Sequence, residues 1–321
     1  MSSRLTRRGL LGAASALSLG LVAGLRPRDA RAEGKVLRIG VQKYGSLVLL
    51  KGKGSLDAAL APLGFTVTWT EFPAGPQLLE ALNVGAVDFG TTGEAPPIFA
   101  QAAGAPLLYV GHEPPAPQGE AIIVPKDSAI ATVADLKGKR VALNKGSNVH
   151  YLLVKALAAA GVDYKEITPV FLPPADARAA FEKGAVDAWA IWDPFLAAAQ
   201  AATGARTLVD GTGLVANHQF YLAEQKFAEA NPQVVDIVLK GLYDIGEEVK
   251  ADPAAAARQL TASVGIPAPI LTTAISRQAF GVKALSPEVI AEQQSIADTF
   301  FGLGLIPKAI SIAEVVRKAA S

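Results

Sequence analysis

The chain has 321 residues with 30 basic and 29 acidic side chains, no cysteine and one methionine. That length can bury a substantial core without disulfides, and the missing cysteines exclude thiolate metal sites, cysteine nucleophiles and cysteine redox chemistry. A formal net charge of +1 gives no electrostatic argument for a nucleic-acid partner.

Residues 1–32 are predicted to be a cleaved export signal. Arg4, Arg7 and Arg8 precede an apolar run of 17 residues (9–25), and a small-x-small cleavage site ends at residue 32. The sequence Thr-Arg-Arg-Gly-Leu-Leu over residues 6–11 resembles a twin-arginine motif. An uncleaved anchor is the alternative, but the run is shorter than the ~20 residues of a spanning helix.

Beyond the signal, short β-type runs alternate with helical spacings, which predicts an α/β fold with parallel sheets and crossover helices. The predicted strands are 36–42, 65–72, 87–90, 107–111, 121–124, 141–143, 167–172 and 188–191. Helices are predicted after Ser46, at Pro76 and at Pro96, and over 147–160. From residue 226 onward the pattern is mostly helical, with proline breaks near residues 232, 253 and 267.

An internal repeat suggests two similar lobes. Residues 82–88 (Leu-Asn-Val-Gly-Ala-Val-Asp) align at an offset of 99 with residues 181–187 (Phe-Glu-Lys-Gly-Ala-Val-Asp). Each copy is followed by a strand, a carboxylate (Glu94 or Asp193) and a helix. Gly-x-x-Asp after a helix is also common turn chemistry, so coincidence is the alternative. Two open α/β lobes would bind a ligand in an interlobe cleft, beyond the carboxyl ends of their strands.

Four loops at predicted strand ends, residues 42–46, 91–96, 144–148 and 192–195, are candidates for this ligand site. Three of them combine glycine with a hydroxyl or amide at a helix start, where free backbone N–H groups favour anions. Taken singly, the serines and asparagines could be N-caps and the tryptophan a core residue. Convergence of all four loops on one cleft favours ligand binding. The candidate residues in these loops are Gln42, Lys43, Tyr44, Gly45, Ser46, Gly93, Glu94, Ser147, Asn148, Trp192 and Asp193.

The sequence lacks the common catalytic motifs. His112, His150 and His218 have no metal-binding spacing, and there is no nucleophile elbow or complete phosphate-binding loop. Glu94 and Asp193 could be written as an acid–base pair, but nothing in their positions supports one. The sequence therefore predicts a binding protein without catalytic residues, metal or cofactor.

Six stretches together resemble the periplasmic aliphatic sulfonate-binding proteins of ABC importers. They are residues 42–45, 71–83, 93–101, 144–150, 192–195 and 217–221. The resemblance spans essentially the whole mature chain and implies a two-lobed type II periplasmic binding protein fold with a double hinge and an interlobe cleft. Lobe 1 is expected over 33–123 plus 218–321 and lobe 2 over 124–217.

The resemblance also implies a periplasmic monomer that carries alkanesulfonates to a membrane permease with a cytoplasmic ATPase. Binders of taurine, nitrate or another oxyanion, and an enzyme on the same fold, are the alternatives. The expected mature chain, residues 33–321, has 24 basic and 28 acidic groups and no sulfur atom, because Met1 leaves with the leader. A sulfur-free carrier fits sulfur scavenging, although drift in an alanine- and glycine-rich composition would also lower the sulfur content.

A sulfonate head group is a monoanion with acceptor oxygens and no proton, so neutral donors suffice. Expected donors are the backbone near Gly45, Ser46 and Gly93, and the side chains of Gln42, Ser147 and Asn148. Tyr44 and Trp192 are expected to contact the alkyl chain, with Lys43 adding long-range attraction. Glu94 and Asp193 would disfavour dianions or receive a ligand amine, and His218 and Gln219 would lie at the hinge or cleft edge.

Overall fold

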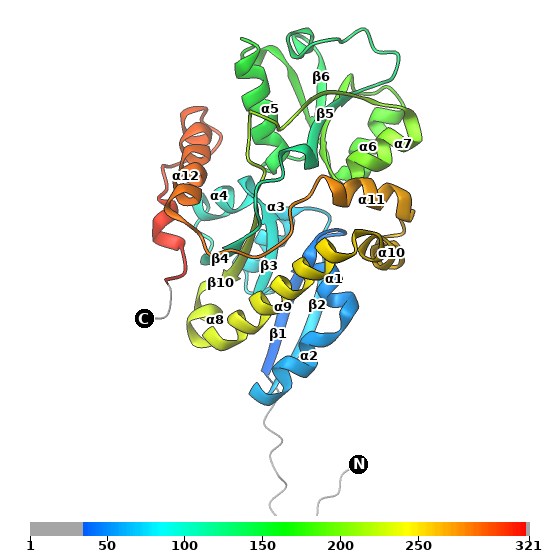
Figure 1. Cartoon of the computed structure of the whole chain (residues 1–321). Coiled ribbons are helices and arrows are strands. Elements are labelled where there is room, and N and C mark those ends of the chain that lie inside the picture. Colours follow the sequence, from blue (N-terminus) through cyan, green and yellow to red (C-terminus); the bar gives the residue numbers. More distant parts are fainter. Residues whose placement is uncertain (1–34, 319–321) are drawn as a thin grey trace, which may run out of the picture. The chain divides into compact units, whose positions relative to one another are not determined.

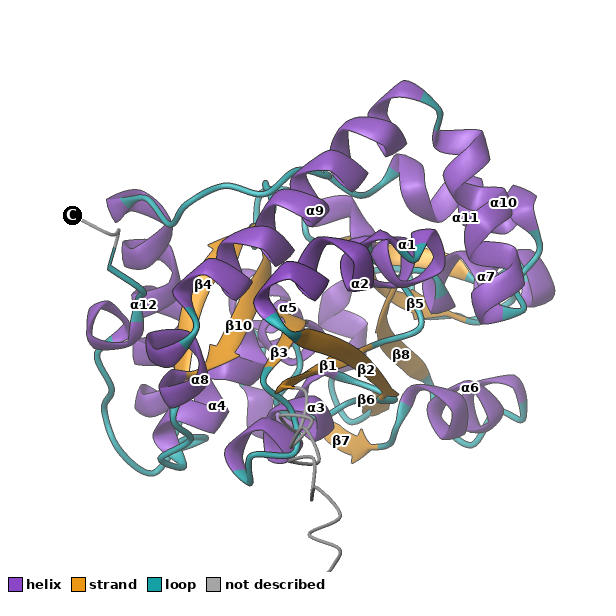
Figure 2. Cartoon of the chain, turned by 90° about the horizontal axis from the view of Figure 1, so that it is seen from below, coloured by secondary structure: helices purple, strands orange, loops and turns teal. Residues whose placement is uncertain are grey.

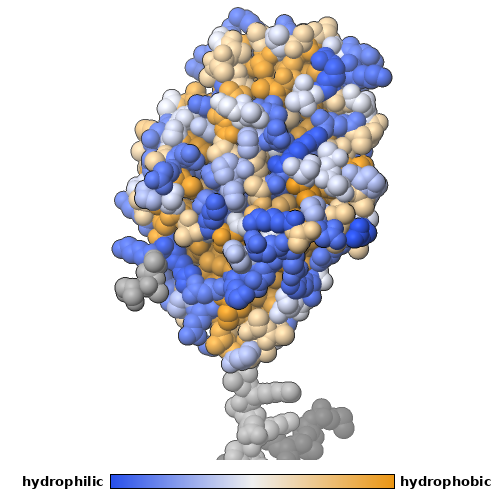
Figure 3. Space-filling view, viewed as in Figure 1, coloured by the Kyte–Doolittle hydropathy of each residue, from blue (hydrophilic) through white to orange (hydrophobic). Residues whose placement is uncertain are grey.

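The structure is a computed structural model and describes residues 35–318, so the predicted export signal lies outside the described residues. Two five-stranded mixed sheets, each flanked by helices, organise these residues (Figure 1). Among the residues described, no helix has both the length and the hydropathy needed to cross a membrane. On the face shown in Figure 3, hydrophilic and hydrophobic residues are mixed over the surface.

The first sheet has the strand order β2-β1-β3-β10-β4. Its strands are β1 (Lys35–Val41), β2 (Phe65–Glu71), β3 (Phe89–Gly93), β4 (Leu107–His112) and β10 (Gln219–Glu224). Strand β1 is parallel to β2 and β3, whereas β10 runs antiparallel to both β3 and β4. The helices of this lobe are α1 (Ser46–Lys53), α2 (Ser55–Leu60), α3 (Gly75–Asn83), α4 (Ala95–Ala102), α8 (Gln225–Ala230), α9 (Pro232–Ala251), α10 (Pro253–Val264), α11 (Ala268–Ser276) and α12 (Pro287–Gly302).

The second sheet has the strand order β7-β6-β8-β5-β9. Its strands are β5 (Glu120–Val124), β6 (Arg140–Leu143), β7 (Thr168–Phe171), β8 (Ala188–Trp192) and β9 (Arg206–Asp210). Strand β5 runs antiparallel to β8 and β9, and β6 is parallel to β7 and β8. The helices of this lobe are α5 (Asn148–Ala159), α6 (Pro174–Glu182) and α7 (Phe195–Thr203).

The two sheets share one topology, and the chain crosses between them twice, over residues 113–119 (the first crossing) and 211–218 (the second crossing). The fourth strand in each of these sheet orders is antiparallel to its neighbours, and the strand before it in the chain belongs to the other sheet. Strand β5 of the second sheet follows β4 of the first, and β10 of the first follows β9 of the second. This double crossing confirms the predicted two-lobed fold. The predicted lobe boundary at residues 123/124 is wrong for β5, because β5 pairs with β8 and β9 of the second sheet.

The predicted parallel sheets are in fact mixed, because β5 and β10 run antiparallel to their neighbours, and the strands β9 and β10 were not predicted. The residues of β10 form a short buried run, which hydrophobic periodicity alone does not distinguish from other buried segments. The third strand continues past its predicted end at residue 90, because Thr91, Thr92 and Gly93 pair with β10. The remaining predicted strands and the proline-initiated helices are confirmed within a few residues.

The internal repeat takes the same structural form in both lobes. The Asp88 carboxylate accepts hydrogen bonds from the backbone N–H and the guanidinium of Arg38 on β1. Asp187 accepts the same set from Arg140 on β6. Each arginine also donates to the carbonyl of the repeat glycine, Gly85 or Gly184. The repeated turn therefore anchors β1 in the first lobe and β6 in the second to the strand that follows the repeat.

Two hydrophobic clusters stabilise the first sheet from opposite faces. Figure 2 shows the helices packed around the two sheets. Helix α9 buries one apolar stripe, including Val238, Leu242 and Ile245, together with residues of α1, α2, α10 and α11. The other cluster contains buried residues of α3 and α4 and continues into β6 and α5 of the second lobe. Within it Phe99 lies 4.9 Å, between ring centroids, from Phe300 of α12. The lobes are thus in apolar contact on the α4–α5–α12 side.

Candidate ligand-binding cleft

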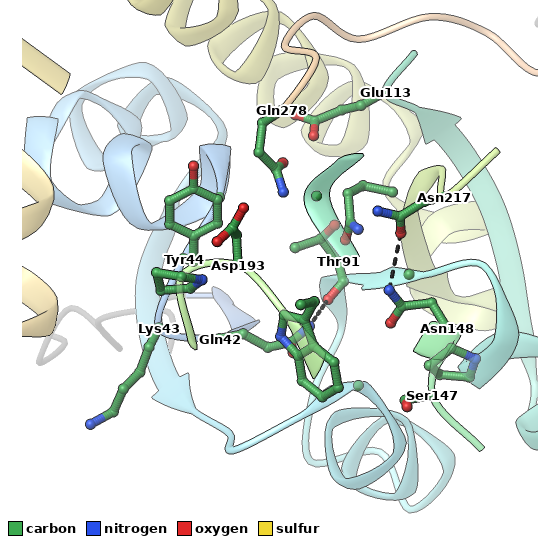
Figure 4. A pocket seen from close by; sticks show the side chains of 18 of the residues that line it. Gln42, Lys43, Tyr44, Thr91, Glu113, Ser147, Asn148, Asp193, Asn217 and Gln278 are labelled. Carbon is green, nitrogen blue, oxygen red and sulfur yellow. Dashed lines mark hydrogen bonds between the residues drawn. The ribbon is translucent and has the colours of Figure 1, made fainter. Parts of the chain in front are cut away.

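A cavity of about 50 Å³ lies where strand ends of both sheets meet (Figure 4). It is lined by the segments that follow β1, β2 and β3 in the first lobe and β6 and β8 in the second, together with both crossings. Its volume is enough for a few waters or a compact ligand group. A larger cavity of about 630 Å³ beside α9, α10 and α11 has no lining residue from the second sheet. Because ligands of open α/β sheets bind beyond the carboxyl ends of the strands, we take the smaller cavity as the candidate cleft.

Ten of the twelve predicted site residues line this cleft. They are Gln42, Lys43, Tyr44, Gly45, Ser46, Gly93, Ser147, Asn148, Trp192 and Asp193. Glu94 and His218 instead line a neighbouring cavity of about 370 Å³ between the second crossing and α12.

The sequence prediction missed several polar residues of the cleft. They are Thr91, Glu113, Asn217, Tyr221 and Gln278, whereas Gln219, expected with His218 at the hinge or cleft edge, does line the cleft. The two crossings and β10 contribute Glu113, Asn217, Gln219 and Tyr221. Recognising the antiparallel strand β10 in the sequence would therefore have pointed to these residues. Gln278 follows α11 in a segment without a motif.

Two helices begin at the cleft, one from each lobe. Helix α1 starts at Ser46 after Gly45, whose φ of 102° is a conformation that favours glycine. Helix α5 starts at Asn148 after Ser147. The first N–H groups of a helix have no intrahelical acceptor and carry the positive end of its dipole. Two such termini facing one cavity form a site suited to an anion.

The polar side chains around these termini already have protein partners. The Ser46 hydroxyl donates to Glu113 at 2.6 Å, and the Ser147 hydroxyl donates to the Asn144 carbonyl at 2.7 Å. The Gln42 amide donates to the Thr91 carbonyl at 3.0 Å. The Ser147 hydroxyl and the Gln42 amide, both expected as ligand donors, are therefore bonded to the protein, whereas the backbone N–H groups at the two helix starts remain available to a ligand.

Asn148 connects the two crossings instead of presenting its amide to the cavity. Its amide nitrogen donates to Glu120 at the start of β5 and, at 3.0 Å, to the Asn217 side chain on the second crossing (Figure 4). Asn217 in turn donates to the carbonyl of Ala116 on the first crossing at 2.8 Å. This network joins α5 to both connections between the lobes.

The carboxylates that line the cleft are Glu113 and Asp193. Burial raises the pKa of Glu113, and hydrogen bonds from the hydroxyls of Ser46 and Tyr221 oppose that shift. Burial raises the pKa of Asp193 to about 6 against the attraction of Arg277. Each carboxylate thus has protein donors.

Lys43 and Tyr44 differ in their relation to the cleft. Lys43 extends away from the other labelled side chains in Figure 4, is half exposed, and lies 3.6 Å from Glu71. Burial raises the pKa of Tyr44 well above its usual value, and its hydroxyl has no partner among the described residues. Lys43 contributes charge from the rim, whereas Tyr44 is part of the buried wall.

Two further carboxyl groups are buried at the crossings. Glu94 accepts the His218 backbone N–H at 3.2 Å, and burial raises its pKa to about 8. Burial, together with the charge of Glu94, raises the pKa of Glu120 well above its usual value. In the described part of the chain no group of three histidine, aspartate or glutamate side chains is placed to hold a metal.

Gly93→Ala is expected to lower the free energy of unfolding by about 1–3 kcal/mol, the usual penalty of overpacking. A Cβ on Gly93 would lie 2.9 Å from Cγ of Asn148, so the side chain that links the crossings would have to move. Urea unfolding of the two proteins measures the difference. Gly302→Ala is the matched control, because its Cβ would meet nothing within 4 Å. Equal stabilities for the two variants would contradict the prediction.

A family model described as NMT1/THI5-like matches residues 64–256. The alkanesulfonate-binding protein SsuA from Xanthomonas axonopodis pv. citri, solved with bound MOPS, is 45% identical, with a TM-score of 0.85 over 90% of this chain and 100% of that one.

Two proteins of Escherichia coli are also similar. The periplasmic aliphatic sulphonate-binding protein SsuA is 46% identical, with a TM-score of 0.79 over 88% of this chain and 97% of that one. The taurine-binding periplasmic protein of strain K12 is 29% identical over 194 residues, which are 59% of each chain.

Proposed function

This chain belongs to the aliphatic sulfonate-binding proteins, with an NMT1/THI5-like match over residues 64–256, and we propose that it captures aliphatic sulfonates for an ABC importer. In this proposal it works in the periplasm as a monomer. It delivers the ligand to a membrane permease that is coupled to an ATPase. The segment 1–32 would direct its export through the twin-arginine route.

The single observation that carries the proposal is the meeting of the α1 and α5 N-termini at one cavity. A sulfonate offers acceptor oxygens and no proton, so the N–H groups at Ser46 and Asn148 can bind it without a cation. Among the described residues that line the cleft, the basic side chain is Lys43, which pairs with Glu71. A site built from neutral donors, with Glu113 and Asp193 nearby, favours a monoanion over a dianion such as phosphate.

The apolar part of the ligand would contact aromatic side chains. Trp192 and Phe195 both line the cleft and form an edge-to-face pair with their ring centroids 6.3 Å apart. Tyr44 adds a buried ring on the side of the first lobe. Such rings contribute apolar area without requiring a particular tail, which suits a class of ligands that share only the sulfonate group.

Lobe closure follows from the placement of the donors. The α1 terminus belongs to the first lobe and the α5 terminus to the second, so both reach one head group only when the lobes are together. A ligand that binds both termini therefore stabilises the closed arrangement. We propose that the permease recognises this closed form.

A thermal-unfolding panel tests the proposed function. Ethanesulfonate, MOPS, taurine, sulfate, nitrate and phosphate are each added to residues 33–321. A sulfonate at 100 times its dissociation constant should stabilise the folded protein by about 2.7 kcal/mol, a shift of several degrees in the midpoint. A shift with nitrate and none with any sulfonate would contradict the proposal. Recovery of unchanged ethanesulfonate after incubation separates a binding protein from an enzyme on the same fold.

A further inference from the structure

The cavity of about 630 Å³ beside α9, α10 and α11 differs from the ligand cleft in its walls and in its chemistry. Apolar side chains of α9, of α11 and of the segment after α11 form most of its lining, including Val249, Ile275, Phe280 and Val282. Tyr243 also lines it and is 50% exposed. The volume lies within the range of small-molecule sites, roughly 300–1,000 Å³. The cavity therefore offers an accessible apolar surface of the right size for a small ligand.

The walls of this cavity are held in place by the first lobe. Phe280 is 6% exposed and belongs to the hydrophobic cluster around α9. The segment after α11 packs tightly on α9, because a Cβ on Gly246 would lie 2.9 Å from Cα of Gly281. The backbone of Lys283 exchanges two hydrogen bonds with His112 of β4, at 2.9 and 3.0 Å. The cavity is thus preformed, and a ligand would order few groups on binding.

The charges at this cavity are positive. Among the described residues that line it there is no acidic side chain, whereas Lys250 and Lys283 both line it. Lys283 is exposed and pairs with no carboxylate in the described part of the chain. Lys250 lies 2.8 Å from Glu247, but both side chains are half exposed, and such a pair contributes little. The expected mature chain has more acidic than basic groups, so this apolar cavity with two lysines is locally complementary to an anion.

We propose that this cavity is a second ligand site, which binds a small anion with an apolar body, such as a medium-chain carboxylate. The apolar body would contact Phe280, Val282 and Tyr243, while Lys283 and Lys250 would pair with the anionic group. A cation would be repelled by the two lysines, and an anion without an apolar body would leave the apolar walls uncovered. Of the residues that line this cavity, Gln278 is the one that also lines the cleft, so the two sites are distinct.

Residues 277–283 connect this second site to the cleft. Helix α11, which precedes them, lies between α10 of the first lobe and α7 of the second (Figure 1). Nη1 of Arg277 lies 3.4 Å from Oδ2 of Asp193, and Nη2 donates to the Gln200 side chain at 2.9 Å, both in the second lobe. A ligand that holds this segment against α9 therefore favours the arrangement in which Arg277 contacts the second lobe. Binding at the second site then strengthens sulfonate binding in the cleft, a consequence that rests on the proposed function.

Isothermal titration of residues 33–321 with octanoate, octylammonium and acetate tests the second site. Octanoate and octylammonium share an eight-carbon chain and differ in charge, whereas acetate has the anionic group without the apolar body. We expect octanoate to bind at one site, and octylammonium and acetate to bind at least tenfold more weakly, a difference of about 1.4 kcal/mol.

Three variants locate the bound octanoate. Thr272→Trp fills the cavity from an exposed position on α11 and is expected to abolish octanoate binding. Lys283→Gln should weaken binding roughly fivefold, which is about 1 kcal/mol, the upper end for an exposed ion pair. Lys308→Gln is the matched control, because it removes an exposed lysine that does not line this cavity. If Thr272→Trp does not fold, Ser276→Phe fills the cavity from the next turn of α11.

A second titration measures the coupling to the cleft. Saturating octanoate is expected to lower the dissociation constant of ethanesulfonate about fivefold in the wild type, the lower end of allosteric couplings. Thr272→Trp, which cannot bind octanoate, should show no such change. Octanoate binding without an effect on ethanesulfonate binding would refute the coupling.

Equal binding of octanoate and octylammonium would overturn the inference, as would unchanged octanoate binding in Thr272→Trp. Ethanesulfonate that displaces octanoate would also overturn it, because octanoate would then lie in the cleft. A wild-type dimer that Thr272→Trp dissociates would contradict it as well, since a second copy of the chain would then cover the cavity. Octanoate binding as expected, in a protein that binds no sulfonate, would refute the proposed function and confirm the second site.

Discussion

Asp88→Ala is expected to lower the free energy of unfolding by about 2–4 kcal/mol, whereas Asp187→Ala should lower it by about 1 kcal/mol. The two aspartates make the same contacts in the two lobes, but the Asp88 side chain is 2% exposed and the Asp187 side chain 32%. Without Asp88 the backbone N–H of Arg38, which it binds at 2.8 Å, loses its acceptor inside the sheet. At Asp187 water can replace the lost carboxylate, so the loss should be smaller.

Denaturant unfolding of the two alanine variants measures this difference directly. Each serves as the matched control of the other, because the hydrogen bonds are equivalent and burial is the variable that differs. Asp88→Asn, which keeps one acceptor oxygen, should fall between Asp88→Ala and the wild type. Losses of equal size at the two positions would show that burial does not decide the energy of this contact.

The same pair of aspartates shows how much of the fold could be predicted from the sequence. The Gly-Ala-Val-Asp turns are local and contiguous, so the repeat and the two-lobed fold could be inferred. The partners Arg38 and Arg140 lie 50 and 47 residues before their aspartates, and no sequence spacing marks such distant pairs. The two crossings were harder to predict, because the sequence of an antiparallel strand that comes from the other lobe does not indicate which strands it pairs with.

The cleft residues likewise differ in whether a local sequence pattern predicts them. Loops that begin a helix carry local signals, and the loops around Ser46 and Ser147 could therefore be predicted. Glu113 and Tyr221 lie 108 residues apart, and only the sheet pairing brings them together in the cleft. The sequence also does not show which side chains are already hydrogen-bonded within the protein. The Ser147 hydroxyl, for example, donates to the Asn144 carbonyl and is therefore not free to donate to a ligand. The ion pair of Asp193 with Arg277 could not be predicted, because the two residues lie in different lobes, 84 residues apart in the sequence.

The buried carboxyls at the crossings lead to the second large prediction, a loss of stability with rising pH. Glu94 is 1% exposed, and burial with the nearby Glu292 raises its pKa to about 8, against hydrogen bonds from the backbone N–H groups of His218 and Asn217. One oxygen of Glu94 and one of Glu120 are buried without a partner in the described chain. Because no cation faces these two carboxyl groups, ionisation of both at once is unfavourable. The folded state therefore keeps a proton on one of them.

The direction of the effect follows from proton binding in the two states. Above its ordinary pKa near 4.5 the glutamate is ionised in the unfolded chain, whereas folded Glu94 stays protonated up to about pH 8. The folded state therefore binds more protons, and stability is lost as pH rises through this range, by about 1.4 kcal/mol per pH unit. Between pH 6.5 and 8 the expected loss from Glu94 is about 2 kcal/mol. Burial lowers the pKa of His150 to about 4, so its opposite contribution falls mainly below pH 6.5.

Glu94→Gln isolates this contribution, because glutamine can still accept the His218 N–H and cannot ionise. Urea unfolding at pH 6.5, 7.25 and 8 should show a smaller loss with pH for the variant, which gains about 2 kcal/mol relative to the wild type across the interval. Glu182→Gln, which removes an exposed carboxylate paired with Arg178 on α6, should follow the wild-type curve. Parallel curves for the wild type and Glu94→Gln would mean that folded Glu94 is already ionised at pH 6.5. A counter-charge would then have to reach the crossing, since a buried carboxylate does not remain ionised without one.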